Sequence, residues 1–122
     1  MKWLPGVRKF LDHLQEWDPP SGRPYSGRYS GCLVADVHRV LLKGGLYFYP
    51  GETKKPEGKL RLMYEAAPLS FLVEQAGGKG STGWQRVNDL VPRSLHQRIP
   101  FWIGSRDDVV LAETYHQAES QT

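Results

Sequence analysis

The chain of 122 residues lacks several sequence features, and each absence excludes a class of protein. A single cysteine, Cys32, cannot form an internal disulfide, so the sequence does not encode a disulfide scaffold and fits a reducing compartment. No apolar run approaches the roughly eighteen residues of a membrane-spanning helix. The N-terminal residues also lack the basic, apolar and small-residue layout of a secretory signal. We therefore expect a cytoplasmic protein with no membrane partner.

Two kinds of catalytic site are also without support. None of the serines stands in the G-x-S-x-G context of a nucleophile elbow, so covalent acyl transfer is not indicated. No two of the four histidines have the spacing of a metal-binding pair. The length allows one domain at most, which is small for a complete α/β enzyme and suits part of a larger one.

Acidic residues are scarce in the middle of the chain, where the positive charge collects. Residues 39–61 hold six lysines and arginines against two glutamates, a balance of +4, while the whole chain carries +3. A basic patch can serve nucleic acid, a membrane surface or a phosphorylated small molecule. Tyr47 and Tyr49 do lie among lysines, but no groove helix or stacking platform is evident. We expect a phosphorylated small molecule and no nucleic acid.

Apolar spacing predicts helices that alternate with strands, which is typical of a layered α/β domain with a mixed sheet flanked by helices. We expect Cys32 to be a small buried residue at the start of the second helix. In the third helix, Leu69, Leu72, Val73 and Ala76 recur at helical spacing and predict its buried face. Helices are predicted at 7–14, 33–41, 65–76 and 107–117, the last one started by Ser105, and strands at 46–49, 79–82 and 101–103.

The segment from Gly58 to Gly78 places Lys59, Arg61 and one carboxylate immediately before an apolar helix. The two cations can offset anionic oxygens, and Glu65 lies where the helix should begin. Pro68 is allowed in the first turn of a helix, and Gly77 with Gly78 should end it. This arrangement suits phosphate and metal chemistry, although a carboxylate at a helix start is also favoured by the helix dipole alone.

Six ordered blocks resemble fructose-1,6-bisphosphatases, in their C-terminal region, over most of residues 24–115. The segment G-K-L-R-L-M-Y-E at 58–65 is followed by E-Q-A-G-G at 74–78, a second half that recurs more widely in the inositol-phosphatase-like superfamily. The other blocks are R-Y-S-G at 28–31, V-A-D-V-H-R at 34–39, G-G-L-Y-F-Y-P at 44–50, H-Q-R at 96–98 and G-S-R-D-D-V at 104–109. The resemblance implies the C-terminal half of a sugar-phosphatase fold.

The resemblance also implies roles for individual residues. Glu65 matches a glutamate that is catalytic and binds Mg²⁺ together with acidic residues of a D-P-[IL]-D-G-[ST] signature, which these 122 residues do not contain. Lys59 matches a lysine that contacts a substrate phosphate, and Tyr49 matches a tyrosine that lines the sugar-phosphate pocket. Both residue types suit phosphate recognition, since a lysine is a point charge and a tyrosine hydroxyl is a hydrogen-bond donor.

Arg28 and Tyr29 match a pair that acts across subunits in this family. The matching arginine enters the neighbouring subunit's active site, and the matching tyrosine contacts substrate phosphate. A planar guanidinium suits bidentate phosphate recognition. The resemblance therefore implies a sugar bisphosphate as substrate and a homo-oligomer, a dimer or tetramer, in the complete enzyme; an arginine in a flexible turn is the alternative for Arg28.

The resemblance therefore implies the C-terminal domain of a fructose-1,6-bisphosphatase, a Mg²⁺-dependent hydrolase of gluconeogenesis, and we expect the chain alone to be inactive. We expect an N-terminal helix and proline-containing linker at 1–23, the domain at 24–118 and a tail at 119–122. One alternative is a sedoheptulose-1,7-bisphosphatase, although the blocks at 34–39 and 47–50 favour fructose. The other is a non-catalytic domain that binds a sugar phosphate or a partner subunit.

Overall fold

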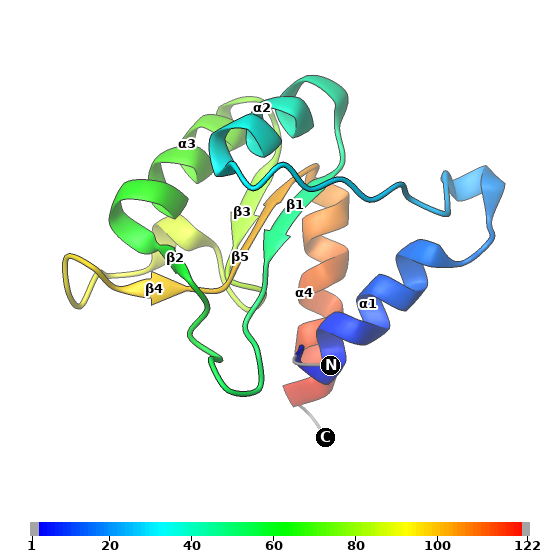
Figure 1. The fold of residues 1–122 in the computed structure, drawn as a ribbon. Helices are drawn as coiled ribbons and strands as arrows, with labels where there is room; N and C mark the ends of the chain where they lie inside the picture. The colour runs from blue at the N-terminus through cyan, green and yellow to red at the C-terminus, as the bar shows by residue number, and fades with distance from the viewer. Residues whose placement is uncertain (1–2, 121–122) are drawn as a thin grey trace.

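The computed structural model describes residues 3–120, in which helices and strands alternate (Figure 1). The order is α1 (Pro5–Gln15), η1 (Pro19–Ser21), α2 (Leu33–Lys43), β1 (Leu46–Tyr49), β2 (Leu60–Arg61), the π-helical η2 (Leu62–Ala66), α3 (Ala67–Gln75), β3 (Lys79–Ser81), η3 (Val87–Asp89), β4 (Arg98–Ile99), β5 (Phe101–Gly104) and α4 (Arg106–Ser120). The predicted helices and strands are present, with ends that differ by a few residues. None of the helices in the described residues is both long and apolar enough to cross a membrane.

The main sheet has three strands in the order β1-β5-β3, and β2 pairs with β4 in a second small sheet. Leu46 lies opposite Gly104 and Tyr49 opposite Phe101, while Lys79 lies opposite Gly104 on the other side of β5. The layered α/β class is confirmed, but every strand pair that the described residues form is antiparallel, whereas the sequence suggested mixed pairing. The strand order leaves β1 at one edge of the main sheet.

The central strand β5 separates two hydrophobic cores. Successive side chains of a strand point to opposite faces, so Phe101 and Ile103 enter one core while Trp102 enters the other. The first core joins β5 to α2, η2 and α3 through Val37, Leu62 and Val73, among others. The second core joins β5 to α1 and α4. These two helices contribute Val7, Phe10, Leu14, Val109 and Ala112 to it. The sheet is therefore covered by helices on both faces (Figure 1).

Helix α1 belongs to this second core. It lies against α4 in Figure 1, and the Phe10 and Trp102 rings meet edge to face with centroids 5.5 Å apart. Pro5 opens the helix, where a missing N–H costs nothing. The next N–H, that of Gly6, donates to Glu119 Oε2 of α4 at 2.9 Å. The amphipathic pattern at 7–14 was thus a correct indication that this helix has one buried face.

Two local predictions were wrong. In α3, Leu72 is 57% exposed and Ala76 is also exposed, because α3 packs against β3 and β5 with only one side, through Ser70 and Val73. Cys32 is exposed, since it precedes α2 at the end of an extended linker that no element covers. Ser105 immediately precedes α4, as predicted, and its hydroxyl also accepts a hydrogen bond from the Gly45 N–H at 3.0 Å, which ties the start of β1 to the end of β5.

We predict that Phe10→Ala destabilises the protein by about 3–5 kcal/mol, because it removes a completely buried ring and leaves a cavity against Trp102. The measurement is the free energy of unfolding in urea. The matched control is Phe71→Ala in α3, where the ring is 59% exposed and the loss should be about 0.5 kcal/mol or less. Similar losses in the two variants would show that α1 does not belong to the core.

Candidate active-site surface

A pocket of about 410 Å³ lies along the free edge of β1, and we call it the sheet-edge pocket. The turn that leads into β1 is possible because Gly44 and Gly45 both have positive φ, at +80° and +101°. This sharp turn folds α2 back beside β1, which brings Arg39 to the pocket. The polar residues in its lining are Arg28, Tyr29, Arg39, Tyr47, Tyr49 and Glu52.

Three of the predicted substrate-binding residues meet at the sheet-edge pocket. Arg28 and Tyr29 come from the linker (residues 22–32), and Tyr49 comes from the end of β1. Tyr29 is 80% exposed and Arg28 is exposed as well, so neither side chain is buried by the fold of this chain. Both are therefore free to contact a ligand or a second subunit.

The fourth residue, Lys59, is placed next to Tyr49 by the loop between β1 and β2. The Lys59 Nζ lies 5.8 Å from the centroid of the Tyr49 ring, within cation–π range. Gly58 makes this possible, because it has a φ of +75° and a side chain there would collide with the backbone of Ile99 and Pro100. The loop backbone thus packs directly on the chain leading into β5 and holds Lys59 over the ring of Tyr49, which lines the pocket.

Glu65 lies at the start of the helical segment, as predicted, but in the π-helical turn η2 that runs into α3. Its Oε1 accepts the Arg61 N–H at 3.0 Å, so the carboxylate satisfies a backbone donor that the helix start leaves open. Pro68 follows in the first turn of α3. The Gly77 and Gly78 N–H groups bond back to Glu74 and Val73, respectively, and close the helix.

The described residues cannot form a Mg²⁺-binding site by themselves. Residues 3–120 contain no group of three or more aspartate, glutamate, histidine or cysteine side chains that could hold a metal ion. Glu65 offers one carboxylate, of which one oxygen is already bonded to the backbone. Mg²⁺ requires octahedral oxygen coordination from carboxylates, substrate phosphate and water. Glu65 can therefore be one ligand of a magnesium site and cannot form the site alone.

Tyr47 is a central residue of this surface that the sequence analysis did not single out. Burial raises the pKa of its phenol to about 12, with smaller contributions from Asp36, Tyr29, Tyr49 and Glu65. Tyr47 thus lies within electrostatic range of three of the predicted site residues, and its hydroxyl keeps its proton as a hydrogen-bond donor. Strand alternation, which puts Tyr47 on the same face as Tyr49, is the signal that could have identified it.

Asp36 is the second residue that sequence reasoning missed. It lies in α2 and is buried, with 3% of its surface exposed. Its Oδ1 is 3.7 Å from Arg39 Nη2, one turn further along the helix. The pair places a buried negative charge behind the pocket and directs one guanidinium along its wall. The block V-A-D-V-H-R at 34–39 of the sequence contained this pair, but its spacing alone gave no reason to assign it to the site.

Comparison with known proteins identifies the family. The family model described as "Fructose-1-6-bisphosphatase, C-terminal domain" matches residues 1–117. The chain belongs to this family. It is 55% identical over 114 residues to "Fructose-1,6-bisphosphatase class 1" of Chlorobium phaeobacteroides, covering 93% of this chain and 34% of that protein. It is 56% identical over 113 residues to "Fructose-1,6-bisphosphatase, chloroplastic" of Pisum sativum, covering 93% of this chain and 28% of that protein.

The family membership predicted from the six blocks is thereby confirmed. This fructose-1,6-bisphosphatase C-terminal domain spans about a third of the length of the curated relatives that it matches. The match begins at residue 1 and so includes α1, which the sequence analysis had assigned to a separate N-terminal segment. The roles of Arg28, Tyr29, Tyr49, Lys59 and Glu65 stay predictions.

We predict that Tyr47→Phe removes a phenolate absorbance step near pH 12, because burial of the phenol raises its pKa to about 12. The folded protein holds this proton more tightly than the unfolded chain. The stability contributed by Tyr47 is therefore present below a pH of about 10 and is lost as the pH rises through about 12. The thermal midpoint should fall less over this range in the variant than in the parent chain.

The control for this titration is Tyr64→Phe, which removes a half-exposed tyrosine of η2. The step near pH 12 should persist in that variant, as should the fall of the thermal midpoint. An unchanged titration curve in Tyr47→Phe would contradict the position that the structure gives to this ring.

Proposed function

We propose that this domain serves an enzyme that hydrolyses the 1-phosphate of fructose 1,6-bisphosphate to fructose 6-phosphate and phosphate, in cytoplasmic carbohydrate metabolism. The observation that carries the proposal is the meeting of Tyr29 and Tyr49 at one pocket, with Lys59 beside the Tyr49 ring, in a chain 55% identical to a fructose-1,6-bisphosphatase. The volume of about 410 Å³ is ample for a sugar phosphate.

In this proposal, the side chains make different kinds of contact with the substrate. A guanidinium presents paired N–H donors to two phosphate oxygens, whereas the Lys59 ammonium acts as a compact point charge beside the Tyr49 ring. The Tyr29 and Tyr49 hydroxyls donate hydrogen bonds, and the Tyr49 ring supports Lys59 from below through the cation–π contact. Such contacts position the sugar bisphosphate so that the 1-phosphate lies toward Glu65.

In the complete enzyme, we propose that Glu65 supplies one carboxylate oxygen to Mg²⁺, with the remaining protein ligands outside the described residues. Bound Mg²⁺ neutralises the charge that spreads over a transferring phosphoryl group and activates water. Since residues 3–120 hold no group of three candidate ligands, the chain alone should not turn over fructose 1,6-bisphosphate.

Sedoheptulose 1,7-bisphosphate remains an alternative substrate, because the same phosphate-binding side chains would serve either sugar. The names of the relatives favour fructose. A non-catalytic domain that binds a sugar phosphate is favoured only by the single carboxylate in the described residues.

A completed enzyme tests the proposal: this chain joined behind the N-terminal two-thirds of the Chlorobium phaeobacteroides relative. We predict that Lys59→Ala raises KM and lowers kcat/KM by about ten- to a hundredfold, since a charge-assisted hydrogen bond contributes about 1.5–3 kcal/mol. Glu65→Gln should instead mainly lower kcat and weaken the dependence on Mg²⁺. Steady-state kinetics over a range of Mg²⁺ concentrations separates the two effects.

The control is Lys54→Ala, an exposed lysine of the same loop; the lysine whose Nζ lies over the Tyr49 ring is Lys59. Its kinetics should match those of the parent enzyme. Two results would refute the proposal: a completed enzyme without phosphatase activity, or 122 residues that work alone at the rate of the whole enzyme. Equal, small effects of Lys59→Ala and Glu65→Gln would assign both residues structural roles.

We further propose that Arg28 binds phosphate in a neighbouring subunit of a homo-oligomer, because its side chain projects from an exposed linker. A homo-oligomer of either variant, Arg28→Ala or Glu65→Gln, should have low phosphatase activity. In mixed dimers, the site on the Arg28→Ala chain keeps its own Glu65 and receives Arg28 from its partner. With equal mixing and random pairing, about half of the dimers are hybrids, and each hybrid has one complete site of two. The mixture should therefore recover about a quarter of the parent activity.

The measurement is phosphate release after the two variants are mixed and exchanged, with hybrid formation followed by native mass spectrometry. If hybrids form without any recovery of activity, Arg28 acts within its own subunit or is only a linker residue.

A further inference from the structure

A second and larger cavity, of about 750 Å³, lies on the other side of Arg28 from the sheet-edge pocket, and we call it the linker-side cavity. The linker forms its roof. Tyr25 anchors the linker at one end, because its N–H donates to Leu14 O at 2.9 Å and its hydroxyl donates to Asp108 Oδ1 at 2.8 Å. Between this anchor and the start of α2, residues 26–28 pass over a hollow between α1, α2 and β1.

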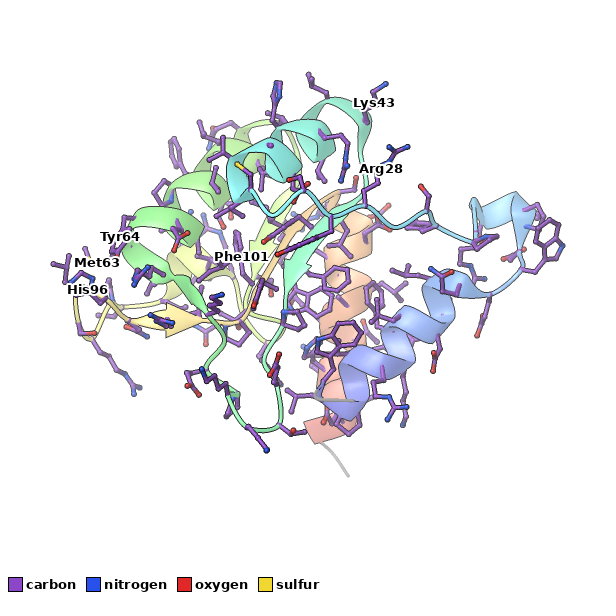
Figure 2. The ribbon with its side chains drawn as sticks, viewed as in Figure 1. Arg28, Lys43, Met63, Tyr64, His96 and Phe101 are labelled. Carbon is purple, nitrogen blue, oxygen red and sulfur yellow. The ribbon has the colours of Figure 1, made fainter. Side chains whose placement is uncertain are left out.

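Three cations line the linker-side cavity. Arg28 comes from the linker, and Arg39 and Lys43 come from the C-terminal half of α2. Figure 2 shows Arg28 and Lys43 on the same side of the molecule. Arg39 and Lys43 are four residues apart, so they lie on one face of the helix, where like charges repel and destabilise it. A bound anion would relieve that repulsion.

No carboxylate balances these charges at the cavity. Its lining, within the part of the chain that the structure describes, contains no aspartate or glutamate. Arg39 is 3.7 Å from Asp36, a long ion pair that leaves most of its N–H donors available. Arg28 and Lys43 form no ion pair with another described residue. The sheet-edge pocket, in contrast, includes Glu52 in its lining.

The rest of the wall is apolar and partly aromatic. Leu14, Val40 and Leu46 contribute aliphatic surface, while Tyr25 and Phe48 contribute rings. A site that combines convergent cations with aromatic walls suits an organic anion that also carries a flat ring. Inorganic phosphate would use only the cations and leave the rings in contact with water.

We propose that the linker-side cavity binds a small organic anion with a ring, its phosphate or phosphonate group on Arg28, Arg39 and Lys43 and its ring against Tyr25 and Phe48. The inference does not require the proposed phosphatase function, because Tyr25 and Lys43 line only this cavity and Tyr49 lines only the sheet-edge pocket. The two sites share Arg28, Arg39, Leu46 and Phe48, so they can be separated experimentally only through the residues that they do not share.

The test is a titration of the 122-residue chain with phenylphosphonate, whose carbon–phosphorus bond a phosphatase does not hydrolyse. Calorimetry should show saturable binding, and amide chemical shifts should change at residues 25–28 and at the end of α2. Lys43→Gln should weaken binding about tenfold or more, through the loss of one charge-assisted contact. Lys43→Glu, which reverses the charge, should abolish it. Methylphosphonate, which has no ring, should bind more weakly than phenylphosphonate.

Two matched variants serve as controls. Lys9→Gln makes the same change at an exposed lysine of α1 that does not line the cavity, and it should leave the affinity unchanged. Lys59→Gln removes the cation beside Tyr49 and should also have no effect, because Lys59 does not line the linker-side cavity. The absence of saturable binding would overturn the proposal. So would equal losses in Lys43→Gln and Lys9→Gln, or a loss confined to Lys59→Gln.

Discussion

The structure depends on the burial of one strand, β5, on both of its faces. Phe101, Trp102 and Ile103 are all completely buried, and their alternation gives each helical layer its own core. β5 is also the only strand of the main sheet that pairs on both sides, with β1 and β3. Its interior position fixes which other strands lie at the edges, and the sheet-edge pocket exists because β1 is one of them.

A close backbone contact at the end of β5 fixes the turn between α2 and β1 in place. Gly104 and Gly45 approach so closely that a side chain on Gly104 would collide with the Gly45 carbonyl oxygen. Ser105 locks the contact from both directions, because its N–H donates to Gly45 O at 2.8 Å and its hydroxyl accepts the Gly45 N–H. The turn between α2 and β1 is therefore held against the start of α4, and Arg39 and Tyr47 are positioned as one unit.

The side chains on this framework suit the binding of anions better than they suit complete catalysis. Cations from the linker, α2 and the loop before β2 surround the edge of the sheet, and their counter-charges lie behind them in Asp36 and beside them in Glu52 and Glu65. The described residues supply one carboxylate suited to a metal and no cluster of them. Since the chain spans about a third of its relatives, we attribute to it the substrate-holding part of the proposed reaction.

Local patterns in the sequence determined the helices, the strands and the family. Apolar spacing located α1, α2 and β5, glycine pairs marked the ends of α2 and α3, and the ordered blocks identified the fructose-1,6-bisphosphatase domain, because each signal lies within a few neighbouring residues. The tertiary structure alone decided the antiparallel pairing of β1 with β5, the exposure of Leu72 and Cys32, and the contact of Lys59 with Tyr49. It also decided the raised pKa of Tyr47 and the hollow beneath the linker. These features depend on which distant segments cover a given residue, and a periodicity shows that a face is apolar without showing what packs against it.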